Sequence, residues 1–293
     1  MKAPDLDMTG GWDFYCHSRP CLLPRWGSAI DVAKAAAELG FAGVVLQAHH
    51  ESTHSRALAA AQVVPEVRSI GGLTLNAYAG GLCVTAVRGA LLAGTRVFWL
   101  PTLQSRAHAA AVGAGHSLSR QFDPGDSGPG LSVLDGGTLS PAVLAILDLL
   151  GEAGAVLNTG HAGLAEIDAL IPAAVSRGVV VVINHPYFLI SPARSWWRRL
   201  PDSGVYTQFA AITQAAPHLP GLADVRQVID VVGPGRCVIG SESGGGTHPL
   251  RQIAAFCAAL IQHGLTPEEV RVMLCDTPAE LASHVLADRG DVS

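Results

Sequence analysis

The chain has 293 residues, of which 49% are hydrophobic and 15% charged, and its formal net charge is −5 at pH 7. This composition is typical of a compact globular protein and excludes extended disorder. The small negative charge provides no general attraction for nucleic acid or for an anionic membrane, so we expect neither as a partner. A single α/β barrel of about 250 residues fits this length, and we expect one domain spanning residues 1–293.

Apolar runs alternate with helical patterns along the chain. Strands are expected at residues 12–16, 42–48, 73–78, 96–100, 155–159, 179–184, 205–212 and 237–241. Helices are expected at residues 29–39 and 54–69, from Gly80–Gly81 to Leu92, after Thr102, and at residues 141–150, 164–176, 250–263, 267–274 and 278–286. Ser28 is the expected N-cap of the first helix. Eight strands that alternate with helices predict the α/β class and closure into a (β/α)8 TIM barrel.

A doubly wound open sheet is the alternative architecture. Against it, no GxGxxG sequence follows the first strand and no Walker A sequence occurs, so neither a dinucleotide site nor a P-loop is indicated. Residues 113–141 are rich in Gly, Pro, Ser and Asp, and a loop of this length in a barrel is expected to act as a lid.

Five of the predicted strands end in side chains that can bind metal. Asp13, Tyr15 and His17 alternate along the first strand and are expected to share one face, because strand residues two apart point the same way. The same period places His49 and Glu51 together. The expected metal ligands are Tyr15, His17, His49, Glu51, His161, His185 and Glu242. Barrel enzymes keep their chemistry at the C-terminal ends of the strands, and seven ligands suit two metal ions.

Tyr15 bears on the identity of the metal. Imidazole and carboxylate suit zinc, iron or manganese alike, whereas phenolate is a hard anionic donor that favours ferric iron. The alternative is a tyrosine that only hydrogen-bonds a ligand. Five other histidines, His108, His116, His218, His263 and His284, are expected to face solvent.

The six cysteines show no CxxC pairing, so we expect buried, reduced thiols, with Cys16 nearest the ligands of the first strand. No segment approaches the ~18 apolar residues of a membrane span, and the N-terminal residues lack the pattern of a signal peptide. These features predict a cytoplasmic protein.

A basic and aromatic segment follows the sixth predicted strand. Arg194, Trp197 and Arg198 are its candidate substrate-binding residues, because bidentate arginine contacts and ring stacking suit a phosphorylated or nucleotide-bearing ligand. The alternative is an amphipathic helix with buried indoles and solvated arginines.

These motifs resemble those of two related groups. Tyr15-Cys16-His17 resembles the HxH element of amidohydrolase-superfamily barrels with tyrosine in the first position, and His161, His185 and Glu242 resemble that superfamily's later ligands. Glu242 stands where aspartate is expected, and Leu100-Pro101-Thr102 stands where a carboxylated lysine is expected. More closely, the whole chain resembles the TIM-barrel nonheme diiron monooxygenases of platensimycin and platencin biosynthesis.

The second resemblance implies a specific reaction. It implies O2-dependent hydroxylation of a polycyclic diterpenoid acid carried as a CoA thioester, with two iron ions as cofactors and a reductase or other external electron donor as partner. Two hypotheses of other classes stay open: a dinuclear metal-dependent hydrolase of an amide, lactone or thioester, and a non-catalytic barrel that binds ligands.

Overall fold

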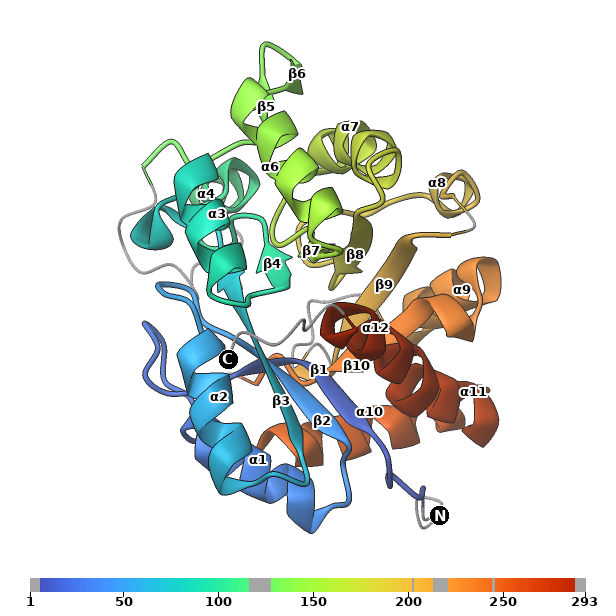
Figure 1. Cartoon of the computed structure of the whole chain (residues 1–293). Helices are drawn as coiled ribbons and strands as arrows, with labels where there is room; N and C mark the ends of the chain where they lie inside the picture. The colour runs from blue at the N-terminus through green and yellow to red at the C-terminus, as the bar shows by residue number, and fades with distance from the viewer. Residues whose placement is uncertain (1–5, 116–127, 202, 213–220, 244–245, 288–293) are drawn as a thin grey trace.

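The computed structural model describes residues 6–115, 128–201, 203–212, 221–243 and 246–287. Eight parallel strands form a nearly closed barrel in the order β1-β2-β3-β4-β7-β8-β9-β10, with helices outside it (Figure 1). The strands are β1 (Trp12–His17), β2 (Gly43–Gln47), β3 (Arg68–Thr74), β4 (Val97–Trp99), β7 (Val156–Asn158), β8 (Val180–Asn184), β9 (Val205–Ala210) and β10 (Cys237–Gly240). The predicted TIM barrel is confirmed.

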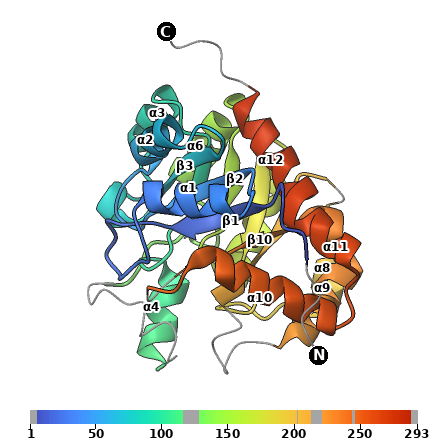
Figure 2. The ribbon, with the colours of Figure 1, turned by 90° about the horizontal axis from the view of Figure 1, so that it is seen from below.

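Helices follow the strands and cover the barrel. They are α1 (Ala29–Glu38), α2 (His54–Val63), α3 (Val84–Leu92), α4 (Arg106–Gly113), α6 (Pro141–Glu152), α7 (Leu164–Val175), α8 (Arg194–Trp197), α9 (Leu222–Val232), α10 (Pro249–Gln262), α11 (Pro267–Arg271) and α12 (Thr277–Leu286). Ser28 caps α1 as predicted, since its side chain accepts a hydrogen bond from the N–H of Asp31 and the Asp31 carboxylate accepts one from the N–H of Ser28. A view turned by 90° shows α1, α10 and α12 around β1 (Figure 2).

Hydrophobic side chains form two clusters on the two faces of the strands. The outer cluster includes Leu46 and Phe98 and packs against the helices, whereas the inner cluster fills the barrel with residues such as Val45, Trp99 and Val182. Strands buried on both faces explain the nearly continuous apolar runs in the sequence. Helix α12 adds Leu281 and Val285 to the inner cluster, so it covers the end of the barrel opposite the C-terminal ends of the strands.

The first and last strands meet through a side chain and a main-chain contact. The N–H of Ser241 donates to Oδ1 of Asp13 at 2.8 Å, and the N–H of Glu242 donates to the carbonyl oxygen of Tyr15 at 2.7 Å. Gly240 makes this approach possible, because a Cβ built there would lie 2.6 Å from the Cβ of Tyr15. Asp13, which the period of β1 placed with the ligands, thus helps to close the barrel.

Several elements differ from their predictions. Strand β3 covers residues 68–74 rather than 73–78. Gly71 and Gly72 lie inside the strand, where a Cβ would collide with the start of helix α2 and with Trp99. Helix α2 ends at Val63 rather than Ser69, just before Pro65.

The region expected to form a lid is described only in part. Residues 116–127 lie outside the described residues, while the rest of this region contains the end of α4 and the hairpin of β5 (Leu134–Asp135) and β6 (Thr138–Leu139).

Helix α9 was not predicted. Within the described ranges, no helix is both long and apolar enough to cross a membrane.

Candidate metal centre

The C-terminal ends of the strands hold most of the predicted ligands. Tyr15, His17, His49, His161 and His185 are all buried there, with no more than 5% of any residue exposed. The structure divides the metal-competent side chains into two groups. The first contains His161, His185 and Glu242, and the second contains His17, Cys21 and His49; we call them the carboxylate group and the thiol group.

The carboxylate group lies where β7, β8 and β10 end. One ligating atom from each of its three residues can be chosen so that all lie within 4.8 Å of one another. Nε2 of His185 is 3.4 Å from Oε1 of Glu242, which is about the separation of two ligands on a tetrahedral zinc ion with bonds of about 2.0–2.1 Å. Nε2 of His185 is buried and has no hydrogen-bond partner within the described residues. This donor set fits a divalent cation.

Strained backbone presents two of these ligands. His185 has a φ of 25° and Glu242 a φ of 47°, values that residues other than glycine rarely adopt. His185 directly follows β8, and Glu242 lies two residues after the end of β10, so the left-handed turn directs each side chain into the mouth of the barrel. Strain of this kind persists where the surrounding structure enforces it, and it is concentrated at functional sites.

A histidine on α4 orients His161. Nδ1 of His108 lies 3.0 Å from Nδ1 of His161, so one of the two rings donates to the other. Donation by His161 leaves its Nε2 with a lone pair for a metal ion. The carbonyl oxygen of His161 also accepts a hydrogen bond from Oγ of Ser105 at 2.8 Å. The expectation that His108 faces solvent was therefore wrong, because α4 packs this residue, fully buried, against His161.

Burial controls the protonation of the carboxylate group. It raises the pKa of Glu242 to about 8, although the charge of Arg25 acts in the opposite direction, and it lowers the pKa of His185 to about 4. Burial and the neighbouring His108 also lower the pKa of His161 well below its usual value. At neutral pH the metal-free group therefore holds neutral imidazoles beside a protonated carboxyl.

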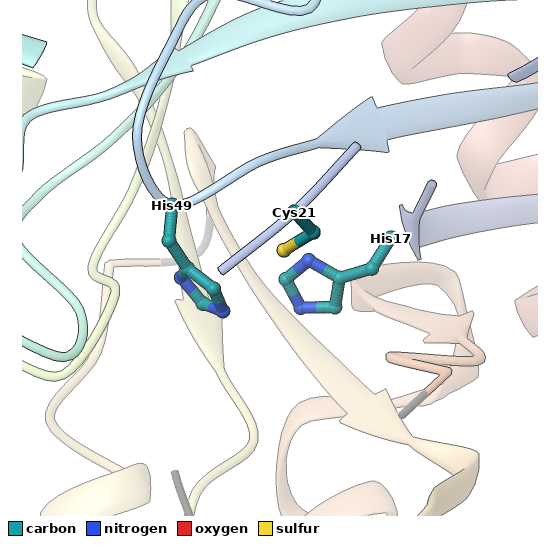
Figure 3. Close-up of side chains that lie close together, drawn as sticks. All are labelled: His17, Cys21 and His49. Carbon is teal, nitrogen blue, oxygen red and sulfur yellow. The ribbon is translucent and has the colours of Figure 1, made fainter. Parts of the chain in front are cut away.

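The thiol group lies beside the ends of β1 and β2. His17 and Cys21 come from β1 and the loop after it, and His49 follows β2; the three side chains point toward one another (Figure 3). Nδ1 of His49 is 3.0 Å from Oγ1 of Thr102, an oxygen that also accepts a hydrogen bond from the side-chain amide of Asn76. Nδ1 of His17 is buried without a hydrogen-bond partner within the described residues.

A buried arginine lies against the thiol group. Nη2 of Arg25 is 3.1 Å from Nε2 of His49, and its Nε donates to Sγ of Cys21 at 3.4 Å. Its Nη1 donates to the carbonyl oxygen of Ser243 at 2.8 Å. Burial and the charge of Arg25 together lower the pKa values of His17 and His49 well below their usual range.

Tyr15 lies between the two groups. Its ring centroid is 5.4 Å from that of His17 and 6.1 Å from that of His185. Its hydroxyl is buried and has no hydrogen-bond partner within the described residues. Burial, reinforced by the charge of Glu242, raises the pKa of Tyr15 well above its usual value, so the metal-free protein holds a neutral phenol there. A role of Tyr15 as a ligand stays a prediction.

Other predicted site residues lie apart from these groups. Glu51 belongs to neither group, because β2 ends at Gln47 and the alternation of side chains ends with it; the Glu51 carboxylate is about half exposed and pairs with Arg56. Cys16, expected nearest the ligands, is buried with its Sγ toward Ser243, while Cys21 joins the thiol group.

The basic and aromatic segment forms the short helix α8. Trp197 is 1% exposed and belongs to the outer hydrophobic cluster, whereas Arg194 and Arg198 are exposed. Trp196 donates a hydrogen bond to Asp168 on α7 at 2.6 Å. This arrangement matches the amphipathic alternative, and the buried ring of Trp197 offers no face to a ligand. Substrate binding by Arg194 and Arg198 stays a prediction.

Three residues of the site were missed in the sequence. Cys21 and Arg25 lie in the loop after β1, at the end of the barrel where ligands were expected, and this position is the signal that could have found them. His108 follows Ser105, which caps α4, but its burial depends on how that helix packs, and the sequence carries no direct sign of this.

Solved structures with the same barrel come from amidohydrolases. A candidate 2-pyrone-4,6-dicarboxylic acid hydrolase from Pseudomonas putida has a TM-score of 0.57 and 17% identity, covering 94% of this chain and 98% of its own. An amidohydrolase from Pseudomonas aeruginosa has a TM-score of 0.63 and 9% identity, covering 98% and 100%. A zinc-bound amidohydrolase from Burkholderia multivorans has a TM-score of 0.51 and 12% identity, covering 93% and 99%. These identities show a shared fold.

The expected O2-dependent diiron monooxygenase was wrong, because the proteins that share this barrel are hydrolases of the amidohydrolase superfamily rather than oxygenases. None of them links the chain to platensimycin or platencin biosynthesis, to iron, or to an electron donor. The coarser expectation, an amidohydrolase-like barrel with side chains that can bind metal, is confirmed.

One family model matches the sequence. Curated protein sequences gave no match. A family described as a family of unknown function, DUF6282, matches residues 10–208. This range runs from β1 into β9 and includes the thiol group together with His161 and His185. The chain belongs to the DUF6282 family.

Proposed function

We propose that this chain is a metal-dependent hydrolase that cleaves an amide, lactone or thioester bond. The observation that carries the proposal is the convergence of His161, His185 and Glu242 at the mouth of the barrel, with ligating atoms within 4.8 Å of one another. The amidohydrolases that share the fold support the reaction class, and the zinc-bound one supports zinc as the metal.

The residues of the carboxylate group suit zinc. Two imidazoles and one carboxylate make up a common catalytic zinc site, which leaves a further position open. The unpartnered Nε2 of His185 and the mostly buried carboxyl of Glu242 are the atoms that would hold the ion. When bound, the ion supplies a Lewis acid that activates water and polarises the substrate carbonyl.

Two other residues have protons or lone pairs available for the reaction. The Tyr15 hydroxyl stays protonated because its pKa is raised, so it donates a hydrogen bond to the carbonyl oxygen as negative charge develops there. His17 stays neutral because its pKa is lowered, and its Nδ1, which has no hydrogen-bond partner within the described residues, accepts the proton of the attacking water and then passes it to the leaving group. His108 holds the ring of His161 in position through the contact between their Nδ1 atoms.

Acid release from a lactone, an amide and a thioester, each carrying a carboxylate, tests the proposal. The zinc-loaded protein is expected to hydrolyse at least one of them at the same rate in air and under nitrogen, since hydrolysis needs no oxidant. His185→Ala should lose this activity, whereas His263→Ala, at the exposed C-cap position of α10, should keep it. No acid release, or full activity in His185→Ala, contradicts the proposal.

A further inference from the structure

Arg25 is a buried cation that has no acidic partner among the described residues. Only 5% of the residue is exposed, and it lies in the loop between β1 and α1. In the described part of the chain, its side chain makes three hydrogen bonds, to the Cys21 sulfur, the Ser243 carbonyl oxygen and the His49 ring. Within the described residues, no carboxylate oxygen lies close enough to the Arg25 guanidinium, within 4.0 Å, to form a salt bridge with it. Burying a charge in this way is costly unless a counter-charge joins it.

Arg25 uses the same lone pairs that a metal ion would need in the thiol group. A guanidinium is always protonated and only donates hydrogen bonds, so Nε2 of His49 must accept from it. The His49 proton then lies on Nδ1, which donates to Oγ1 of Thr102. Sγ of Cys21 accepts from Nε of the same guanidinium. The guanidinium and a metal ion therefore exclude each other at two of the three ligating atoms.

The guanidinium still has unused donors. Three of its five N–H groups have partners within the described residues, which leaves two available. The charge of Arg25 lowers the pKa values of Glu242 and Tyr15, so it acts on the carboxylate group as well as on its own neighbours. A carboxylate suits such a donor best, because its two oxygens match the planar guanidinium.

We propose that Arg25 takes the place of a second metal ion in this barrel and binds the carboxylate of an acidic substrate. The chain then holds one metal ion, in the carboxylate group, and Arg25 anchors the substrate beside it. The inference rests on the proposed function for the reaction that follows binding, but metal stoichiometry and anion binding are measured without any turnover.

Zinc titration of the metal-free protein tests the first half. The wild-type protein is expected to bind one zinc ion per chain, and Arg25→Met is expected to bind a second, since it frees His49 and Cys21. The double variant Arg25→Met/Cys21→Ser should return to one ion. Arg56→Met is the matched control, because Arg56 is also mostly buried, pairs with Glu51 and touches neither group. Two ions in the wild-type protein, or one in Arg25→Met, overturns the inference.

Calorimetry with succinate, a plain dicarboxylate, tests the second half. Succinate is expected to bind the wild-type protein at least about tenfold more tightly than Arg25→Met, since a charge-assisted, bidentate contact is lost. Arg25→Lys, which keeps the charge without the planar donors, should lie between them, and neutral succinamide should not bind. Thermal melting of each variant shows that the barrel is folded. Equal binding of succinate by the wild-type protein and Arg25→Met overturns the inference.

The two proposals fail in different ways. If His161→Ala binds zinc as the wild-type protein does, the carboxylate group is not the metal site and the proposed function fails. Succinate binding by the metal-free wild-type protein, lost in Arg25→Met, would still support Arg25 as the anion-binding residue.

Discussion

Glu242 is a carboxyl group whose environment favours the proton. Its pKa is raised to about 8 from an ordinary value of 4.5, mainly by burial. The folded, metal-free protein thus binds this proton more tightly than the unfolded chain does. Folding stability must then fall as the pH rises from about 4.5 to 8, because the unfolded chain releases the proton first.

The variant Glu242→Gln should remove this dependence. Between about pH 5 and 8 the metal-free wild-type protein is expected to lose on the order of 4 kcal/mol more unfolding free energy than the variant does. Urea unfolding of both proteins at the two pH values measures the difference, with chelator present to exclude metal. Equal losses in the two proteins would show that the carboxyl is not held in its protonated form.

Tyr15→Phe separates catalysis from folding. The variant removes only a buried hydroxyl that has no hydrogen-bond partner within the described residues, so the melting temperature should stay the same or rise. Loss of the donor to the carbonyl oxygen should reduce kcat roughly 10²–10³-fold. A kcat like that of the wild-type protein would exclude Tyr15 from the reaction.

His108→Phe tests how the neighbouring ring holds His161. The variant keeps an aromatic ring but loses the Nδ1 contact at 3.0 Å. Zinc affinity, measured by competition with a chelator, is expected to fall about 10–100-fold, as for other groups that orient metal-binding histidines. His263→Phe is the control. Equal zinc affinities in the two variants would mean that His108 has no part in the site.

At the scale of the elements, the meeting of β1 and β10 links the closure of the barrel to the site. Asp13 and Tyr15 of β1 accept hydrogen bonds from the backbone N–H groups of the two residues that follow β10. These two residues are Ser241 and Glu242. The position of Glu242 therefore depends on how closely these two strands approach. Gly240 is the residue that sets this approach.

Gly240→Ala should damage both the fold and the site. Its added methyl group would lie 2.6 Å from the Cβ of Tyr15, a distance that forces the strands apart. A loss of about 1–3 kcal/mol of unfolding free energy is expected, together with weaker zinc binding. Gly235→Ala, where an added Cβ meets nothing within 4 Å, is the matched control. Unchanged stability and zinc affinity in Gly240→Ala would contradict this account of the closure.

Strand periods predicted part of the site and could not predict the rest. Tyr15 and His17 were placed correctly in the barrel because β1 extends through both. Glu51 was misplaced because β2 ends four residues before it. Cys21 and Arg25 lie in a loop, where no periodicity relates sequence to direction, and His108 depends on the packing of α4. Apolar runs located the strands, except that β3 begins at Arg68, five residues before its expected start at Leu73.

At the scale of the whole molecule, the barrel brings side chains from distant parts of the chain to one end. The carboxylate group joins residues that follow β7, β8 and β10, while the thiol group and Arg25 come from the first quarter of the sequence. The mouth of the barrel therefore has two unlike halves: one half offers imidazole nitrogens and a carboxylate, and in the other half the guanidinium of Arg25 is hydrogen-bonded to the atoms of His49 and Cys21 that could bind a metal ion.

X-ray absorption spectroscopy of the protein loaded with one equivalent of zinc tests this division most directly. A zinc ion in the carboxylate group should show only nitrogen and oxygen neighbours at about 2.0–2.2 Å, including imidazole scattering. A zinc–sulfur distance of about 2.3 Å would instead place the ion with Cys21 in the thiol group, and it would contradict the assignment of His161, His185 and Glu242 as the metal centre.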